Sequence, residues 1–203
     1  MCGSREQWNL HSIETKNYIA EFYISKRDDA RGIYAPLLSG AGGTLYHGPT
    51  ASGSSAYSYK LDSIKLYNKH DRYKNTTSAV PVKSVYFVYD YSLCSGVSNN
   101  LTHAGKLTLQ KIYFSYGNSR KSMISPYQFK YGINPVYNLA QKDRWGDFKP
   151  NGATMTNYEF PYVNQNAPND SLASAWSLVE VDLPSGGIIK AEYESNDYAF
   201  VQD

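Results

Sequence analysis

Hydrophobic and polar residues alternate along most of this chain, with the period of two that is typical of half-buried β-strands. The pattern predicts eight strand segments, at residues 11–15, 18–25, 59–67, 82–91, 106–116, 127–131, 177–183 and 188–194. Stretches rich in Gly, Ser, Asn, Ala and Pro predict loops between them, including residues 38–57 and 163–172. A short helix is the alternative for residues 136–143. We therefore expect an all-β fold of antiparallel hairpins in a meander, forming a curved sheet or a sandwich, with long loops and little helix.

Two local patterns sharpen this expectation. Residues 177–183 and 188–194 flank the turn sequence Pro184-Ser-Gly-Gly187, in which glycine can adopt a positive φ, and together they predict a β-hairpin. In the segment 59–67, the spacing of Leu61 and Ile64 breaks the period of two, which indicates a β-bulge.

Composition narrows the class of protein. The chain has 203 residues, 20 of them basic and 18 acidic, and its formal net charge is +2. A hydrophobic fraction of 41% argues against intrinsic disorder, and the near-neutral charge argues against a nucleic-acid partner. The longest apolar runs are too short for a transmembrane helix, so we expect no transmembrane segment. We expect residues 1–203 to form a single β-rich region.

The residues that usually carry chemistry do not gather into a motif. The histidines are widely spaced, and none forms a metal-ligand pair; they are His11, His47, His70 and His103. Gly40-Ala-Gly-Gly43 lacks the Lys-Ser/Thr of a phosphate-binding loop. Of the two cysteines, Cys2 is interpreted as a free terminal thiol and Cys94 as a small buried hydrophobe. We therefore predict no catalytic residue, no metal, no cofactor and no enzymatic activity.

A carbohydrate-binding module is the alternative. Aromatic rings could form a platform for a sugar, and the candidates are Trp145, Tyr127, Tyr131 and Tyr137. Four acids of the predicted hairpin could supply the two carboxylates of a glycoside hydrolase, and they are Glu180, Asp182, Glu192 and Glu194. Each group also has an ordinary structural interpretation, as packing for the Trp and as the polar side of a half-buried sheet for the acids. The alternative predicts a self-contained β-sandwich with a surface glycan as its partner.

Residues 178–194 resemble the strand–turn–strand unit of Rhs/YD-repeat proteins, whose repeats follow the pattern Leu-x-x-Val-x-x-Pro-x-Gly-Gly and end in Tyr-Glu/Asp. Four further stretches are similar to very large surface or secreted Bacteroidetes proteins that carry Rhs-like segments, at residues 85–94, 105–117, 143–146 and 193–202. The resemblance implies a β-rich shell or scaffold that bacteria export. It therefore implies a non-enzymatic structural segment, located outside the cell or at its surface.

The chain departs from the Rhs pattern in three respects. It lacks the strict tandem YD period, it contains no self-cleavage or toxin region, and it is far shorter than such shells. A fragment of a longer chain would explain all three, and residues 198–203 still alternate like a strand. The expected partner is then the remainder of the parent chain, in the form of neighbouring β-hairpins.

Overall fold

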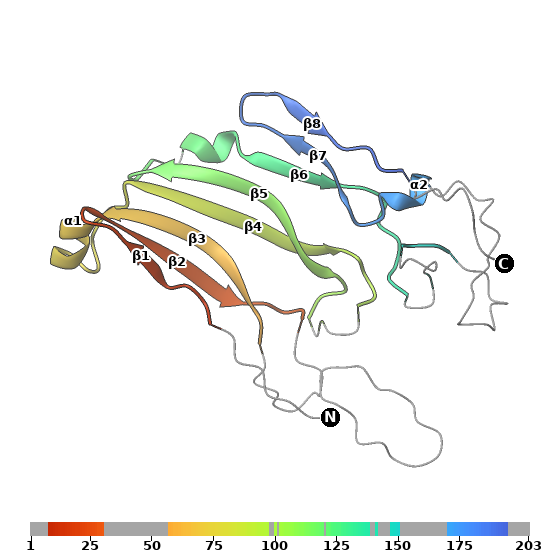
Figure 1. Ribbon diagram of the computed structural model, residues 1–203, viewed down its shortest axis with the longest axis horizontal. Coiled ribbons are helices and arrows are strands. Elements are labelled where there is room, and N and C mark those ends of the chain that lie inside the picture. The colour runs from red at the N-terminus through yellow and green to blue at the C-terminus, as the bar shows by residue number, and fades with distance from the viewer. Residues whose placement is uncertain are drawn as a thin grey trace, which may run out of the picture.

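The eight strands that the structure describes form one antiparallel sheet in which each strand pairs with the next along the chain. The computed structural model describes residues 8–30, 57–97, 100, 102–119, 121–138, 141, 147–150 and 170–194. The sheet is curved and open, with β1 at one edge and β8 at the other (Figure 1).

The strands coincide with the predicted segments, except that β8 ends at Lys190, four residues before the end of the predicted segment 188–194. They are β1 (Ser12–Glu14), β2 (Tyr18–Lys26), β3 (Tyr59–Asn68), β4 (Lys83–Leu93), β5 (Lys106–Tyr116), β6 (Tyr127–Tyr131), β7 (Leu178–Asp182) and β8 (Ile188–Lys190). The all-β prediction is thus confirmed. Of the two shapes expected, these strands form the curved sheet, because all eight belong to one sheet rather than to two.

The predicted hairpin and bulge are both present. In the turn between β7 and β8, the N–H of Gly186 donates to the carbonyl of Leu183 at 2.9 Å, and Gly186 has a φ of +85°. Between β2 and β3, Tyr23 lies opposite Ser63 while Ile24 lies opposite Leu61. Asp62 is therefore the extra residue of a bulge in β3.

Within the described ranges, three short helical segments interrupt the meander, namely α1 (Lys69–Lys74), the 3₁₀ turn η1 (Lys121–Ile124) and α2 (Asp170–Ala173). The side chain of Asn68 caps α1 by accepting a hydrogen bond from the N–H of His70 at 3.0 Å. Alternation predicted none of them, because their residues have no apolar periodicity.

The remaining loop and helix predictions fall mostly on residues that are not described. For the expected loop at 163–172, residues 163–169 lie outside the described residues, and α2 begins at Asp170. For the loop at 38–57, only Tyr57 is described, just before β3. The described part of 136–143, residues 136–138 and 141, contains no helix. Within the part of the chain that the structure describes, no helix has the length and apolar character needed to cross a membrane.

Candidate functional site

One face of the sheet is apolar from edge to edge, and we call it the apolar face. The register places Phe22 opposite Ile64, Ile64 opposite Val85, and Val85 opposite Phe114. Because side chains alternate between the two faces of a sheet, the register also assigns the other members. Its apolar and aromatic members are Ile13, Ala20, Phe22, Ile64, Leu66, Val85, Phe87, Ile112, Phe114, Tyr127, Phe129, Val181 and Ile189. The register also places Lys83 on this face, opposite Leu66 and Tyr116.

None of these side chains is fully buried. At the two edges, Ile13 and Ile189 are more than half exposed. Because every described strand belongs to the same sheet, no second described sheet covers this face. A sheet normally buries its apolar side against another layer, and a large uncovered apolar area usually marks an interaction site. The apolar face is therefore the candidate functional surface.

The opposite face, which we call the tyrosine face, carries tyrosines, serines and charged residues. It comprises Ile19, Glu21, Tyr23, Ser63, Lys65, Tyr67, Ser84, Tyr86, Val88, Lys111, Tyr113 and Ser115. Its small serines, Ser63, Ser84 and Ser115, are buried. The rings of Tyr86 and Tyr113 stack across β4 and β5, with centroids 5.0 Å apart and planes 16° from parallel. Long side chains thus cover the short ones on this face.

A buried charge on the tyrosine face is held by α1. The guanidinium of Arg72 donates to both carboxylate oxygens of Glu21, at 2.8 and 3.2 Å, and the hydroxyl of Tyr23 donates at 2.6 Å. Burial acts to raise the pKa of Glu21, but the hydrogen bonds from Arg72 and Tyr23 outweigh it and hold that pKa below its usual value. Burial, followed by the bond to Glu21, raises the pKa of Tyr23. Near neutral pH, Glu21 is thus ionised and Tyr23 protonated.

A second buried acid fixes the corner where β2 ends. Asp29 is 2% exposed and accepts two hydrogen bonds from Arg27, at 2.9 and 2.8 Å. It also accepts one from the backbone N–H of Leu107 in β5, at 2.9 Å. Burial acts to raise the pKa of Asp29, but these bonds hold it below its usual value. Asp29 therefore ties the end of β2 to the beginning of β5.

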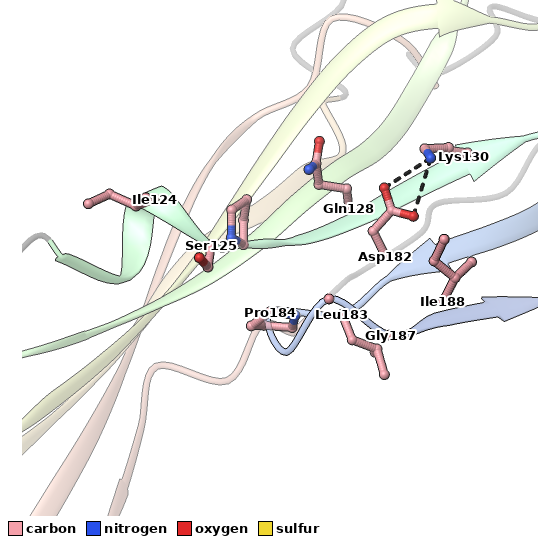
Figure 2. Close-up of a pocket in the computed structure, with 11 residues that line it drawn as sticks. Ile124, Ser125, Gln128, Lys130, Asp182, Leu183, Pro184, Gly187 and Ile188 are labelled. Carbon is pink, nitrogen blue, oxygen red and sulfur yellow. Dashed lines mark hydrogen bonds and ion pairs between the residues drawn. The ribbon is translucent and has the colours of Figure 1, made fainter.

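Of the four predicted acids, Glu180 and Asp182 form ion pairs with Lys130. A groove of about 390 Å³ lies between the η1–β6 segment and the β7–β8 hairpin. Figure 2 shows its lining residues, and Asp182 is the one carboxylate among those described. Lys130 contacts both Asp182, at 2.9 Å, and Glu180, at 2.6 Å. Glu192 and Glu194 lie beyond the end of β8 and are exposed. This groove thus lacks the opposed pair of carboxylates that glycoside hydrolysis needs.

The three tyrosines of the predicted aromatic platform make separate contacts. Tyr127 packs edge-on against Phe114, whereas the hydroxyl of Tyr131 donates to the carbonyl of Leu109 at 2.7 Å. Tyr137 instead contacts Trp176, with ring centroids 6.1 Å apart. Trp145 lies outside the described residues.

Trp176 is a structural residue that sequence reasoning missed. Its indole N–H donates to the carbonyl of Pro135 at 2.9 Å, and its ring packs edge-on against Phe148 with centroids 5.2 Å apart. It thereby joins the segment after β6 to the segment before β7. The only indication of this role in the sequence is that Trp176 directly precedes a predicted strand, and this position does not predict which residues it contacts.

The histidines and the cysteine with described positions do not gather into a metal site. No group of three metal-ligating side chains occurs among the residues with described positions. His103 stacks on Tyr91 and lies 3.2 Å from a carboxylate oxygen of Asp28, whereas His47 and Cys2 are not among the described residues. Cys94 is a free, buried thiol whose pKa is raised by burial, which confirms its interpretation as a small hydrophobe.

Comparison with known proteins adds no relative: no family model matches the chain, and no curated protein or solved structure matches it either.

Proposed function

We propose that the chain is a non-enzymatic structural segment of a bacterial Rhs/YD-repeat-like surface or secreted protein. In this proposal, its apolar face packs against neighbouring β-hairpins of the parent chain. The observation that carries the proposal is that an eight-stranded sheet presents an apolar face on which no side chain is fully buried. Covering that face removes apolar area from water, which is worth roughly 25 cal/mol per Å².

The strand order supports a role as part of a wall. Each strand pairs with its neighbour in sequence, so a hairpin added at an edge such as β1 extends the sheet without any crossing connection. The segment 178–194, which carries the resemblance to Rhs/YD repeats, contains the β7–β8 hairpin, which lies at one edge of the sheet. A meander of this kind can therefore be lengthened hairpin by hairpin.

The charged groups support the same role. The buried acids Glu21 and Asp29 each accept paired hydrogen bonds from an arginine, and Glu180 is bound by Lys130. These contacts join strands, helices and corners of the sheet. In this proposal they stabilise the curved sheet, and the apolar face packs against the neighbouring hairpins.

The test compares two pairs of facing residues on the same two strands. Phe87 and Ile112 lie opposite each other on the apolar face, and Val88 and Lys111 lie opposite each other on the tyrosine face. We expect the wild type to bind a hydrophobic dye, and Phe87→Thr/Ile112→Thr to reduce this binding severalfold while keeping the β-sheet circular dichroism spectrum. The control, Val88→Thr/Lys111→Thr, should leave dye binding unchanged; threonine favours strands in both variants.

Three results would contradict the proposal. The first is a wild type that binds no dye, and the second is a Phe87→Thr/Ile112→Thr variant that unfolds as a core variant would. The third is a glycan-array ligand whose binding is lost in Trp145→Ala, which would support the carbohydrate-binding alternative instead.

A further inference from the structure

Among the described residues, the outer edge of β8 has no partner strand. β8 pairs with β7 on one side, and no described strand lies on its other side. Its residues are exposed, with Ile188 at 57% and Ile189 at 56%. An open strand edge presents unpaired N–H and C=O groups, which another strand can bind.

The hydrogen bonds within the hairpin show which groups point outward. The N–H of Leu183 donates to the carbonyl of Gly187, and the N–H of Ala191 donates to the carbonyl of Val179. In an antiparallel pair such bonds fall on alternate residues, so Gly187, Ile189 and Ala191 point their backbone groups toward β7. Ile188 and Lys190 therefore direct their N–H and C=O groups away from the sheet.

We propose that β8 pairs with β8 of a second copy of this chain, antiparallel, around a two-fold axis at Ile189. Ile188 of each copy then lies opposite Lys190 of the other, and the outward N–H and C=O groups form four hydrogen bonds. The two Ile189 side chains meet on the apolar face at a non-hydrogen-bonded position, where cross-strand side chains lie closest. The interface is isologous, as a two-fold axis requires.

Charge favours this register. Centring the axis on Lys190 would place two lysines opposite each other, which is destabilising. Centring it on Ile188 would place Lys190 opposite Gly186, which has a φ of +85° and lies in the turn rather than in a strand. In the proposed register, Lys190 of one copy lies opposite Ile188 of the second copy, and that Ile188 lies opposite Asp182 within its own hairpin. Lys190 and this Asp182 are therefore on the same face, two strand spacings or about 10 Å apart, where their opposite charges attract.

The edge at β1 differs in its charge. Glu14 of β1 is bound by Lys69 at 2.7 Å and accepts a hydrogen bond from the hydroxyl of Tyr73 at 2.7 Å, both from α1. A two-fold axis on Ile13 would place the outward residues Ser12 and Glu14 opposite each other. Helix α1 thus binds a side chain of the β1 edge, whereas no described helix binds the side chains of β8. We therefore assign the pairing of two copies to β8. This inference concerns an edge of the sheet and does not depend on the function proposed for its apolar face.

Disulfide trapping in the full chain tests the register. Facing residues at a non-hydrogen-bonded position have Cα atoms about 4.5 Å apart, within reach of a disulfide. We expect Ile189→Cys to give a covalent dimer on mild oxidation, seen on a non-reducing gel. The matched control, Lys190→Cys, should not do so, because its two copies lie more than about 7 Å apart in this register. The wild type controls for Cys2 and Cys94.

A second variant tests the hydrogen bonds. Lys190→Pro removes an outward N–H while leaving the bonds between β7 and β8 intact, because proline is tolerated at a sheet edge. Sedimentation over a concentration series should show a wild-type dimer and at least tenfold weaker dimerisation in Lys190→Pro. A wild type that is monomeric throughout, equal trapping by both cysteine variants, or an unchanged Lys190→Pro dimer would overturn the inference. Trapping through Ile189→Cys should persist in Phe87→Thr/Ile112→Thr, which separates this test from that of the apolar face.

Discussion

The two faces of the sheet are covered in opposite ways. On a sheet with one face toward water, the apolar side chains are usually buried and the polar ones exposed. In this protein, the buried positions of the central strands lie on the tyrosine face, among them Ile19, Tyr67 and Ser84. The apolar face has no fully buried member.

The difference arises from what lies above each face. On the tyrosine face, α1 contributes Arg72 over Glu21 and over the ring of Tyr67, and Lys65 lies over the ring of Tyr23 at 4.5 Å. On the apolar face, Lys83 lies over the ring of Phe114 at 4.7 Å, and Tyr127 packs edge-on against the same ring. We infer that the tyrosine face contributes most to stability and that the apolar face is available for binding.

The largest expected effect follows from replacing one aromatic ring on each face. Tyr67 is 6% exposed and packs under Arg72, so Tyr67→Ala should lower the free energy of unfolding by about 3 kcal/mol. Phe114 is only partly covered, so Phe114→Ala should cost about 1–2 kcal/mol. Urea denaturation of both variants measures the difference.

Tyr67→Phe is the control, because it keeps the ring and removes only the hydroxyl, which lies 3.3 Å from that of Tyr23. It should cost clearly less than Tyr67→Ala. If Phe114→Ala instead costs as much as Tyr67→Ala, the apolar face is covered like a core, and the contrast between the faces fails.

The next effect is a loss of stability in acid. Glu21 and Asp29 have pKa values below their usual values in the folded protein, so their contribution is complete above the unfolded-state pKa of about 4. It is lost as the pH falls through their lowered folded-state values. The free energy of unfolding should therefore be level from about pH 7 to pH 5 and fall below about pH 4, as followed by denaturant titration at each pH.

Glu21→Gln should be less stable at neutral pH, because Arg72 loses its ionised partner, and its stability should fall less steeply in acid. An identical acid limb in wild type and Glu21→Gln would show that the cluster at Arg72 does not contribute. Above the acid transition, dye binding to the apolar face should not change with pH, because its members carry no group that titrates in this range.

Alternation located all eight strands because the side-chain period of a strand is two whatever its partners are. The same alternation separates Phe22 from Glu21 and Val85 from Ser84, so membership of the two faces could also be predicted. Whether a second layer packs on the apolar face could not be predicted, because that packing depends on contacts between residues far apart in the sequence. The alternation of residues is therefore compatible with both a single curved sheet and a sandwich.

The misses have physical causes as well. α1 is polar all round, and its main signal was the capping residue Asn68. Trp176 packs against Tyr137 and Phe148, which are distant in the sequence, so a local pattern could not predict these contacts. The acids Glu192 and Glu194 lie outside the hairpin because β8 ends at Lys190. Local pattern does not determine where a ladder of cross-strand bonds stops.

The smallest predicted effect compares one cross-strand pair from each face. Tyr86 and Tyr113 stack at 5.0 Å on the tyrosine face, and a double-mutant cycle with alanine should give a coupling of about 1 kcal/mol. Phe87 and Ile112 lie opposite each other on the same two strands but on the apolar face, and we expect their coupling to be about half as large. Both cycles use urea denaturation and share the same backbone ladder, so strand propensity largely cancels. A stronger coupling for Phe87 and Ile112 would show that the apolar side chains are held as firmly as the tyrosines, which a face open for binding should not be.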